Sequence, residues 1–218
     1  MLSITDASRE ATGDAGMHYD VTIITVHPGT HPAALARLKE TLTSSTGGEL
    51  LACWYSDIGA LNRILLIRAA DIMRINADRA KQLRTENPFG IGEYIVGMSM
   101  DAYVAFPFMQ AMKAGRYGPV FEVRTYVLKP GGLPATIELW RTWGPGRANL
   151  SPLLAAMHSI TGTVTRFMHI WPYADLNERA RLRAKAVTDK LWPPPGGPDH
   201  LATMKSDIYF AADFSPMY

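Results

Sequence analysis

FEVRTYVLKPGGLPA, at residues 121–135, has a counterpart earlier in the chain, where residues 19–33 read YDVTIITVHPGTHPA. Both stretches open with an aromatic residue and an acid, and both reach Pro-Gly-x-x-Pro-Ala at the same point. β-Branched residues that stop at Pro-Gly are typical of a strand followed by a turn, and proline favours the first turn of a helix. The sequence therefore predicts a strand, a turn and a helix twice.

The similarity between the two copies continues downstream. Residues 59–67 align with residues 162–170, and residues 101–103 align with residues 207–209. The alignment stays collinear, with small changes of offset that short loop insertions explain. Such a pattern indicates an internal repeat.

Each copy predicts the element order βαββαβ. The strands are rich in apolar and β-branched residues, and the helices start at a proline or a capping aspartate. The expected strands cover residues 19–26, 50–55, 61–68 and 96–106 in the first copy, and 120–128, 153–158, 163–171 and 203–211 in the second. The expected helices start at residues 30–32 and 71 in the first copy and cover residues 133–143 and 175–191 in the second.

This order is that of the ferredoxin-like fold, in which both helices cover one face of a four-stranded sheet. Here the other face of each sheet is also apolar, so both faces need burial. Two sheets in one chain meet that need by closing into a barrel, which also reduces exposed strand edges. We expect an α+β fold of two tandem ferredoxin-like units, with a disordered extension over residues 1–16, a first repeat over 17–107, a linker over 108–119 and a second repeat over 120–218.

Composition argues against several classes of protein. The formal net charge is only +2, and Lys and Arg are not clustered with aromatic residues, so no nucleic-acid partner is expected. Cys53 is the only cysteine, which excludes an intrachain disulfide, and no group of acidic and histidine residues has metal-ligand spacing. The sequence predicts no metal site, no membrane span and no signal peptide, and hence a cytoplasmic protein.

Glu122, Arg124 and Tyr126 alternate along a predicted strand and therefore share one of its faces. A carboxylate beside a guanidinium and a phenol could orient a polar ligand and act as acid or base. The alternative is a structural ion pair inside the barrel, because a buried charge needs a partner. The first copy has Thr22 and Ile24 in place of Arg124 and Tyr126, so we expect any chemistry in the second copy only.

His169 lies between Phe167 and Trp171 on one face of a predicted strand. It could be a general base or an axial ligand of haem, whereas the ordinary role of such a residue is in a hydrogen-bonded core. The residues predicted to line a substrate site are aromatic or basic: Trp171, Phe167, Trp140, His158, Tyr209 and Arg166. The alternative is packing for the aromatic residues and solvation for the arginine. The basic run over residues 179–185 is expected to face solvent.

Several motifs of the second copy occur together. They are residues 121–131, Gly118-Pro119, His169-Ile170-Trp171-x-Tyr173, Asn177-Glu178-Arg179 and Phe214-Ser215-Pro216. With them the chain resembles the NIPSNAP family over about residues 17 to 216. The resemblance implies the dimeric α+β barrel fold, here as a fused pseudo-dimer, in a superfamily of cofactor-free monooxygenases, isomerases, cyclases and haem-dependent enzymes. Further association of superfamily members implies a homodimer of the fused chain.

On these grounds we expect a small-molecule enzyme that oxygenates or isomerises an apolar or aromatic substrate without a cofactor. Glu122 or His169 would act as acid or base, and Arg124 and Tyr126 would polarise an oxygen. The alternative is a non-catalytic ligand-binding or assembly protein of the NIPSNAP family. A second alternative is a haem-binding protein that uses His169 as the iron ligand.

Overall fold

The computed structural model of the protein describes residues 18–42 and 47–218. The first copy consists of β1 (His18–Val26), α1 (His31–Leu42), β2 (Glu49–Ile58), β3 (Arg63–Ala70), α2 (Ile72–Arg84) and β4 (Ile95–Ala105). The second copy consists of β5 (Val120–Leu128), α3 (Leu133–Ala148), β6 (Ala155–Ser159), β7 (Arg166–Tyr173), α4 (Leu176–Thr188) and β8 (Leu201–Ala211). The order βαββαβ is confirmed in both copies, while the extension over residues 1–16 lies outside the described residues.

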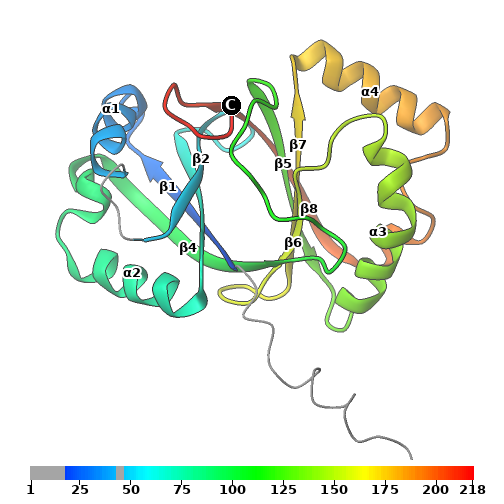
Figure 1. Ribbon diagram of the computed structural model, residues 1–218, viewed down its shortest axis with the longest axis horizontal. Coiled ribbons are helices and arrows are strands. Elements are labelled where there is room, and N and C mark those ends of the chain that lie inside the picture. Colours follow the sequence, from blue (N-terminus) through cyan, green and yellow to red (C-terminus); the bar gives the residue numbers. More distant parts are fainter. Residues whose placement is uncertain (1–17, 43–46) are drawn as a thin grey trace, which may run out of the picture.

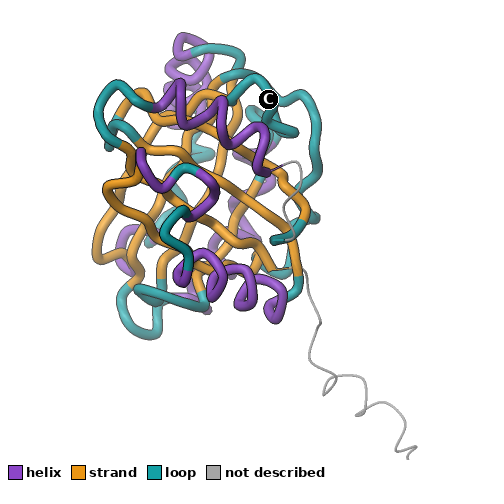
Figure 2. The backbone as a smooth tube through the Cα atoms, turned by 90° about the vertical axis from the view of Figure 1, so that its left-hand side faces the viewer, coloured by secondary structure: helices purple, strands orange, loops and turns teal. Residues whose placement is uncertain are grey.

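The strands close into one antiparallel barrel in the order β1-β3-β2-β8-β5-β7-β6-β4. The two copies join where β2 pairs with β8 and where β4 pairs with β6. Figure 1 shows α1 and α2 on one side of the barrel and α3 and α4 on the other. In Figure 2, turned by 90°, the strands form a continuous wall with the helices outside it. The expected closure of two ferredoxin-like units into a pseudo-dimer is confirmed.

Side chains from every strand of the barrel fill its inside. The indole of Trp54, from the first copy, stacks on the ring of Phe121, from the second, with centroids 3.9 Å apart. Met112, from the segment between β4 and β5, and Met217, near the C-terminus, also belong to this core. The interior of the barrel is therefore packed with side chains, and the space for a ligand lies outside the barrel wall.

Two further cores lie between the barrel wall and the helices. Ile24, Leu38 and Leu66 belong to the one beneath α1 and α2. Tyr126 and Trp140 belong to the one beneath α3 and α4, which is richer in large aromatic side chains. Alternate residues of β1 and β5 thus point into the barrel and toward the helices, as expected for strands buried on both faces.

Aspartate caps fix where two of the helices begin. Asp71 accepts a hydrogen bond from the backbone N–H of Arg74 at 2.9 Å, and Asp175 accepts one from Glu178 at 2.7 Å. Each satisfies one of the backbone donors that a helix start leaves free, as the sequence predicts. No helix among the described residues is long and apolar enough to cross a membrane.

The helix α3 continues beyond its predicted end at residue 143. Gly144-Pro145-Gly146 indicates a stop, because proline lacks a backbone donor and glycine weakens a helix. The structure instead continues to Ala148. Arg147 holds this last turn against the sheet: its guanidinium lies 4.3 Å from the ring centroid of Trp171 and donates to the Tyr173 hydroxyl at 3.2 Å. That tertiary contact outweighs the local preference.

Candidate functional site

Glu122, Arg124 and Tyr126 share one face of β5, as predicted. That face is turned toward α3 and α4, because Phe121 and Val123 point the other way and fill the barrel. The carboxylate of Glu122 therefore lies between the sheet and the helices, and not inside the barrel as the structural interpretation had it. It is fully buried there.

Two arginines of α4 donate hydrogen bonds to the Glu122 carboxylate. Its Oε1 accepts from Arg179 Nη2 at 2.8 Å, from Arg183 Nη1 at 3.0 Å, and from the hydroxyl of Ser206 at 2.8 Å. Arg124 Nη1 lies 3.5 Å from the same oxygen. Burial alone would raise the pKa of Glu122, but the hydrogen bond from Arg179 and the charges of Arg183 and Arg124 lower it. A carboxylate so fully occupied is a weak base.

Sequence reasoning missed the partners of Glu122. Arg179 and Arg183 were expected to face solvent, yet both reach the carboxylate, while Arg181 between them remains exposed. Positions four apart on a helix share a face, which was the available signal. The sequence contains no such signal for Ser206 on β8, since only the pairing of β8 with β5 brings it to this site.

His169 lies on β7, opposite Arg124 in the register of the two strands. Its Nδ1 accepts a hydrogen bond from the indole Nε1–H of Trp171 at 2.7 Å. An indole nitrogen only donates, so Nδ1 must be unprotonated and Nε2 carries the hydrogen. Burial, followed by the charges of Arg124, Arg183 and Arg147, holds the pKa of His169 well below its usual value. His169 is thus a neutral donor and not a free base.

A cavity of about 270 Å³ lies beside His169, between β5, β7, α3, α4 and the loop before β8. Three of the rings that surround His169 also line this cavity: Tyr126, Trp140 and Phe167, with centroids 4.9, 4.6 and 5.0 Å from the imidazole. Other residues that line the cavity include Arg124, Thr136, Arg183, Val187, Trp192 and Pro194. The structure therefore joins four of the predicted residues in one apolar cavity with two guanidinium groups.

Comparison with known proteins bears directly on this half of the chain. The NIPSNAP family profile matches residues 121–216, which carry the whole cavity. The second half of the chain is a NIPSNAP domain by this match. A Protein NipSnap homolog of Dictyostelium discoideum is 23% identical over 158 residues, which is 70% of each chain.

Solved structures extend the likeness to the complete barrel. An anthrone oxidase-like protein superposes with a TM-score of 0.65 and 8% identity, over 90% of this chain and 91% of the other. A candidate monooxygenase from Lactobacillus acidophilus NCFM superposes with a TM-score of 0.59 and 8% identity, over 89% and 93%. At such identities these likenesses establish the fold of the chain and leave its activity open.

The first copy repeats the buried carboxylate but not the aromatic cavity. Asp20, at the position of Glu122, accepts from Arg68 Nη2 at 2.7 Å and from Arg79 Nη2 at 3.0 Å. Phe89, from the loop before β4, belongs to the core around Leu38, and the corresponding loop of the second copy places Trp192 4.7 Å from Trp140. The duplicated ion pair indicates a structural role for the carboxylate. The cavity at the helices of the first copy, of about 210 Å³, is lined by Thr41, Gln82 and Phe89 and lacks the aromatic wall of the one in the second half.

Haem does not fit at His169. An iron ligand needs a free imidazole nitrogen, yet Nδ1 accepts from Trp171 and Nε2 bears the hydrogen. The rings of Tyr126, Trp140 and Phe167 also stand within 5.0 Å of the imidazole and take the space of a macrocycle. The described part of the chain also contains no group of three or more His, Cys, Asp or Glu suited to a metal ion.

Four predicted site residues lie away from the cavity or only behind it. Trp171 backs the His169 imidazole, and His158 lies on β6 opposite Phe167 in register, where burial lowers its pKa. Tyr209 points into the barrel core, where burial raises its pKa to about 12. Arg166 pairs with Asp101 at 2.7 Å at the start of β7.

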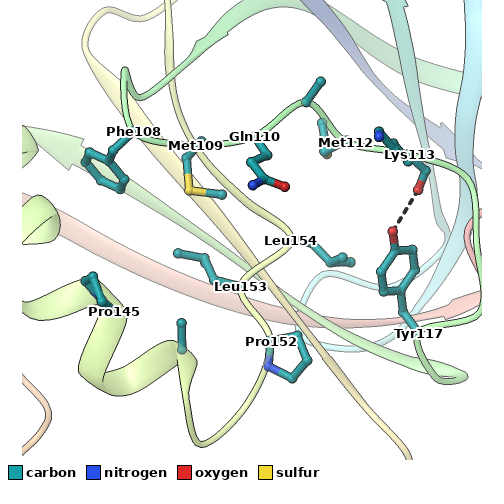
Figure 3. A pocket seen from close by; sticks show the side chains of 13 residues that line it. Phe108, Met109, Gln110, Met112, Lys113, Tyr117, Pro145, Pro152, Leu153 and Leu154 are labelled. Carbon is teal, nitrogen blue, oxygen red and sulfur yellow. Dashed lines mark hydrogen bonds between the residues drawn. The ribbon is translucent and has the colours of Figure 1, made fainter.

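A larger cavity, of about 400 Å³, lies elsewhere (Figure 3). It is bounded by the segment before β5, with Phe108 and Met109, and by Pro152 and Leu153 ahead of β6. Within it the Tyr117 hydroxyl donates to the backbone carbonyl of Lys113 at 3.0 Å. None of the predicted site residues lines it, so the chemistry-bearing groups favour the smaller cavity.

Proposed function

We propose that the NIPSNAP half binds a small, mostly apolar molecule with an aromatic body in the cavity beside Trp140. The observation that carries the proposal is internal to the chain. In the first copy, Phe89 packs with Ile24, Leu38 and Leu66, which stand where Tyr126, Trp140 and His169 stand in the second copy. In the second copy the corresponding loop places the ring of Trp192 4.7 Å from Trp140, and a cavity of about 270 Å³ nevertheless remains between these rings and β5.

The chemistry of the cavity wall supports the same conclusion. Ligand sites are mostly apolar and carry a few polar groups that orient the ligand. Here Trp140, Phe167 and Trp192 provide the apolar wall, and Arg124 and Arg183 provide the polar groups. Aromatic walls suit a planar ligand because rings pack edge-to-face or offset-stacked.

The test of binding is calorimetric titration with 2-naphthalenemethanol, a neutral two-ring probe. Val187 lines the cavity and is largely exposed, so Val187→Trp should obstruct the entrance without disturbing the core. Leu83 has the equivalent exposed place on α2, which makes Leu83→Trp a matched control. Binding to the parent and to L83W, with loss in V187W, is expected. Equal binding by all three proteins would contradict the proposal.

Cofactor-free oxygenation or isomerisation is the second candidate function. It is favoured by Arg124 and Arg183, which would stabilise an enolate or phenolate oxygen of a bound substrate. Such an anion can react directly with O2 or take a proton at another carbon. Neither Glu122 nor His169 offers a free basic lone pair, so the substrate would lose its proton to water or arrive as an anion.

Anthrone is a suitable first substrate, because the fold is similar to that of an anthrone oxidase-like protein. Anthrone and O2 would give anthraquinone and one water, which an oxygen electrode and the absorbance of the quinone both follow. Turnover above the uncatalysed rate that Arg124→Met abolishes would support catalysis. Binding without oxygen uptake for anthrone and related enolisable ketones would leave a ligand-binding protein. The expected homodimer is a separate proposal, which sedimentation equilibrium would test.

A further inference from the structure

The buried charges of the first copy balance. The carboxylates of Asp20 and Asp78 pair with the guanidinium groups of Arg68 and Arg79, with contacts between 2.6 and 3.0 Å. Two negative charges therefore face two positive ones. Buried charges are stable when they are paired in this way.

The equivalent charges of the NIPSNAP half do not balance. Arg124, Arg179 and Arg183 all approach the single carboxylate of Glu122, at 3.5, 2.8 and 3.0 Å. Arg147 is buried nearby, with 3% of its surface exposed, and reaches Glu122 only through the hydroxyl of Tyr173. The single negative charge of Glu122 is thus the only one near four guanidinium groups among the described residues.

No other acid among the described residues neutralises this excess. Glu178 accepts from the backbone N–H of Ala174 and lies 3.9 Å from Arg181 on the exposed face of α4. Asp175 caps the same helix. Water can screen Arg179 and Arg183, whose side chains are 27% and 39% exposed, but it reaches Arg124 and Arg147 much less.

The unbalanced charge borders the cavity. Arg124 and Arg183 both line it, and both approach the same oxygen of Glu122, so their guanidinium groups lie close together at one end. The Nε of Arg124 is buried without a hydrogen-bond acceptor among the described residues, and so is the Nε2 of His169, which is 1% exposed. Of these two residues Arg124 lines the cavity, so its donor would be satisfied by an acceptor that enters there.

We infer that the ligand of this cavity is an anion, whose carboxylate or phenolate oxygen binds between Arg124 and Arg183 while its aromatic body lies against Trp140. The inference rests on the proposed binding function and adds the charge of the ligand to it. A planar guanidinium suits a carboxylate because it offers two parallel donors. A ligand with one negative charge would restore part of the balance that the first copy achieves with Asp78.

The test compares 2-naphthoate with 2-naphthamide, which have the same ring system and differ in charge. Titration calorimetry at pH 7.5 and low salt should give about 10- to 100-fold tighter binding of the carboxylate, as a charged acceptor strengthens its hydrogen bonds. Arg124→Met and Arg183→Gln should each reduce that preference. Arg181→Gln, on the exposed face of the same helix, is the matched control and should keep it.

The outcomes separate the two proposals. A preference for the carboxylate that falls in R124M or R183Q, with amide binding retained as evidence of an intact cavity, would support the anion. Equal affinity for both compounds, or a preference that R181Q also loses, would overturn the anion while leaving the binding cavity. Absence of binding for both compounds would overturn the two proposals together.

Discussion

Replacing Glu122 by glutamine should destabilise the fold before it affects any chemistry. The carboxylate ties β5 to α4 through Arg179 and Arg183, and ties β5 to β8 through Ser206. Glutamine has nearly the same shape but no charge, and its amide nitrogen would face a guanidinium at one of the two oxygen positions. The substitution therefore removes the ion pairs while keeping the packing.

The size of the loss follows from these contacts. A hydrogen bond to a charged group contributes about 1.5–3 kcal/mol and a neutral one about 0.5–1.5 kcal/mol, so the two short arginine bonds lose about 1 kcal/mol or more each. Removing one partner of a buried ion pair costs about 3–5 kcal/mol. Because Arg179 and Arg183 are partly exposed and can be hydrated, we expect about 2–4 kcal/mol.

Urea unfolding followed by far-UV circular dichroism measures this loss as a lower midpoint. Asp20→Asn is the comparison in the first copy, where Arg68 is 1% exposed and cannot be hydrated, so its loss should be about 3–5 kcal/mol. The pKa of Glu122 is lowered in the folded protein, so its contribution is complete above the usual glutamate pKa and declines as pH falls through the folded value. The difference between E122Q and the parent should therefore shrink below about pH 4.5.

One result would refute this reasoning. If E122Q unfolds at the parent midpoint but no longer binds 2-naphthoate, the carboxylate serves the ligand and not the fold. A midpoint difference that stays constant between pH 7 and pH 3 would also contradict the assigned charge state of Glu122.

Other substitutions test other parts of the structure. His169 is neutral when folded but takes up a proton when unfolded, so the parent should lose about 1 kcal/mol between pH 6.5 and 5.5, and His169→Gln should show a smaller slope in urea unfolding at those pH values. Trp140→Ala should cost about 3–5 kcal/mol, seen as a lower thermal midpoint, because the side chain is buried among four aromatic partners. Gly162→Ala should cost at least about 2 kcal/mol by the same assay, since its φ is +69° and the added methyl would overlap the Asp101 carboxylate.

The fold was readable because it occurs twice. A single copy of the stretch at residues 19–33 would predict little more than a strand and a helix, but its alignment with residues 121–135 fixed the order of elements. Closure into a barrel followed from the apolar residues on both faces of each sheet. The end of α3 was not readable, because the contact of Arg147 with Trp171 that holds it joins residues far apart in the chain.

The candidate site was readable only in part. The alternation along β5 correctly grouped Glu122, Arg124 and Tyr126 on one face. It could not tell which face was the barrel interior, because both are apolar. It also could not show that the carboxylate is occupied by Arg179 and Arg183, since that depends on how α4 lies across the sheet. Whether a carboxylate oxygen is free to accept a proton depends on its contacts in the folded protein, and the periodicity of a strand does not show those contacts.

Equivalent positions in the two copies explain how the second became charged. Arg68 pairs with Asp20 across β1 and β3, and Trp171 takes its place opposite Glu122. Asp78 and Leu182 are equivalent positions, because each follows the capping aspartate of its helix by the same number of residues. The second copy therefore lacks both the acid Asp78 and the base Arg68.

Besides Arg147, two gains then remain uncompensated: Arg124 stands where the first copy has Thr22, and Arg179 where it has Ile75. Neither is required to bury the carboxylate, because Asp20 is fully buried with Arg68, Arg79 and a threonine as its partners. Since unneeded buried charge destabilises a fold, these arginines are best explained by a group that the chain itself does not supply. The open cavity at Arg124 is the place such a group can enter.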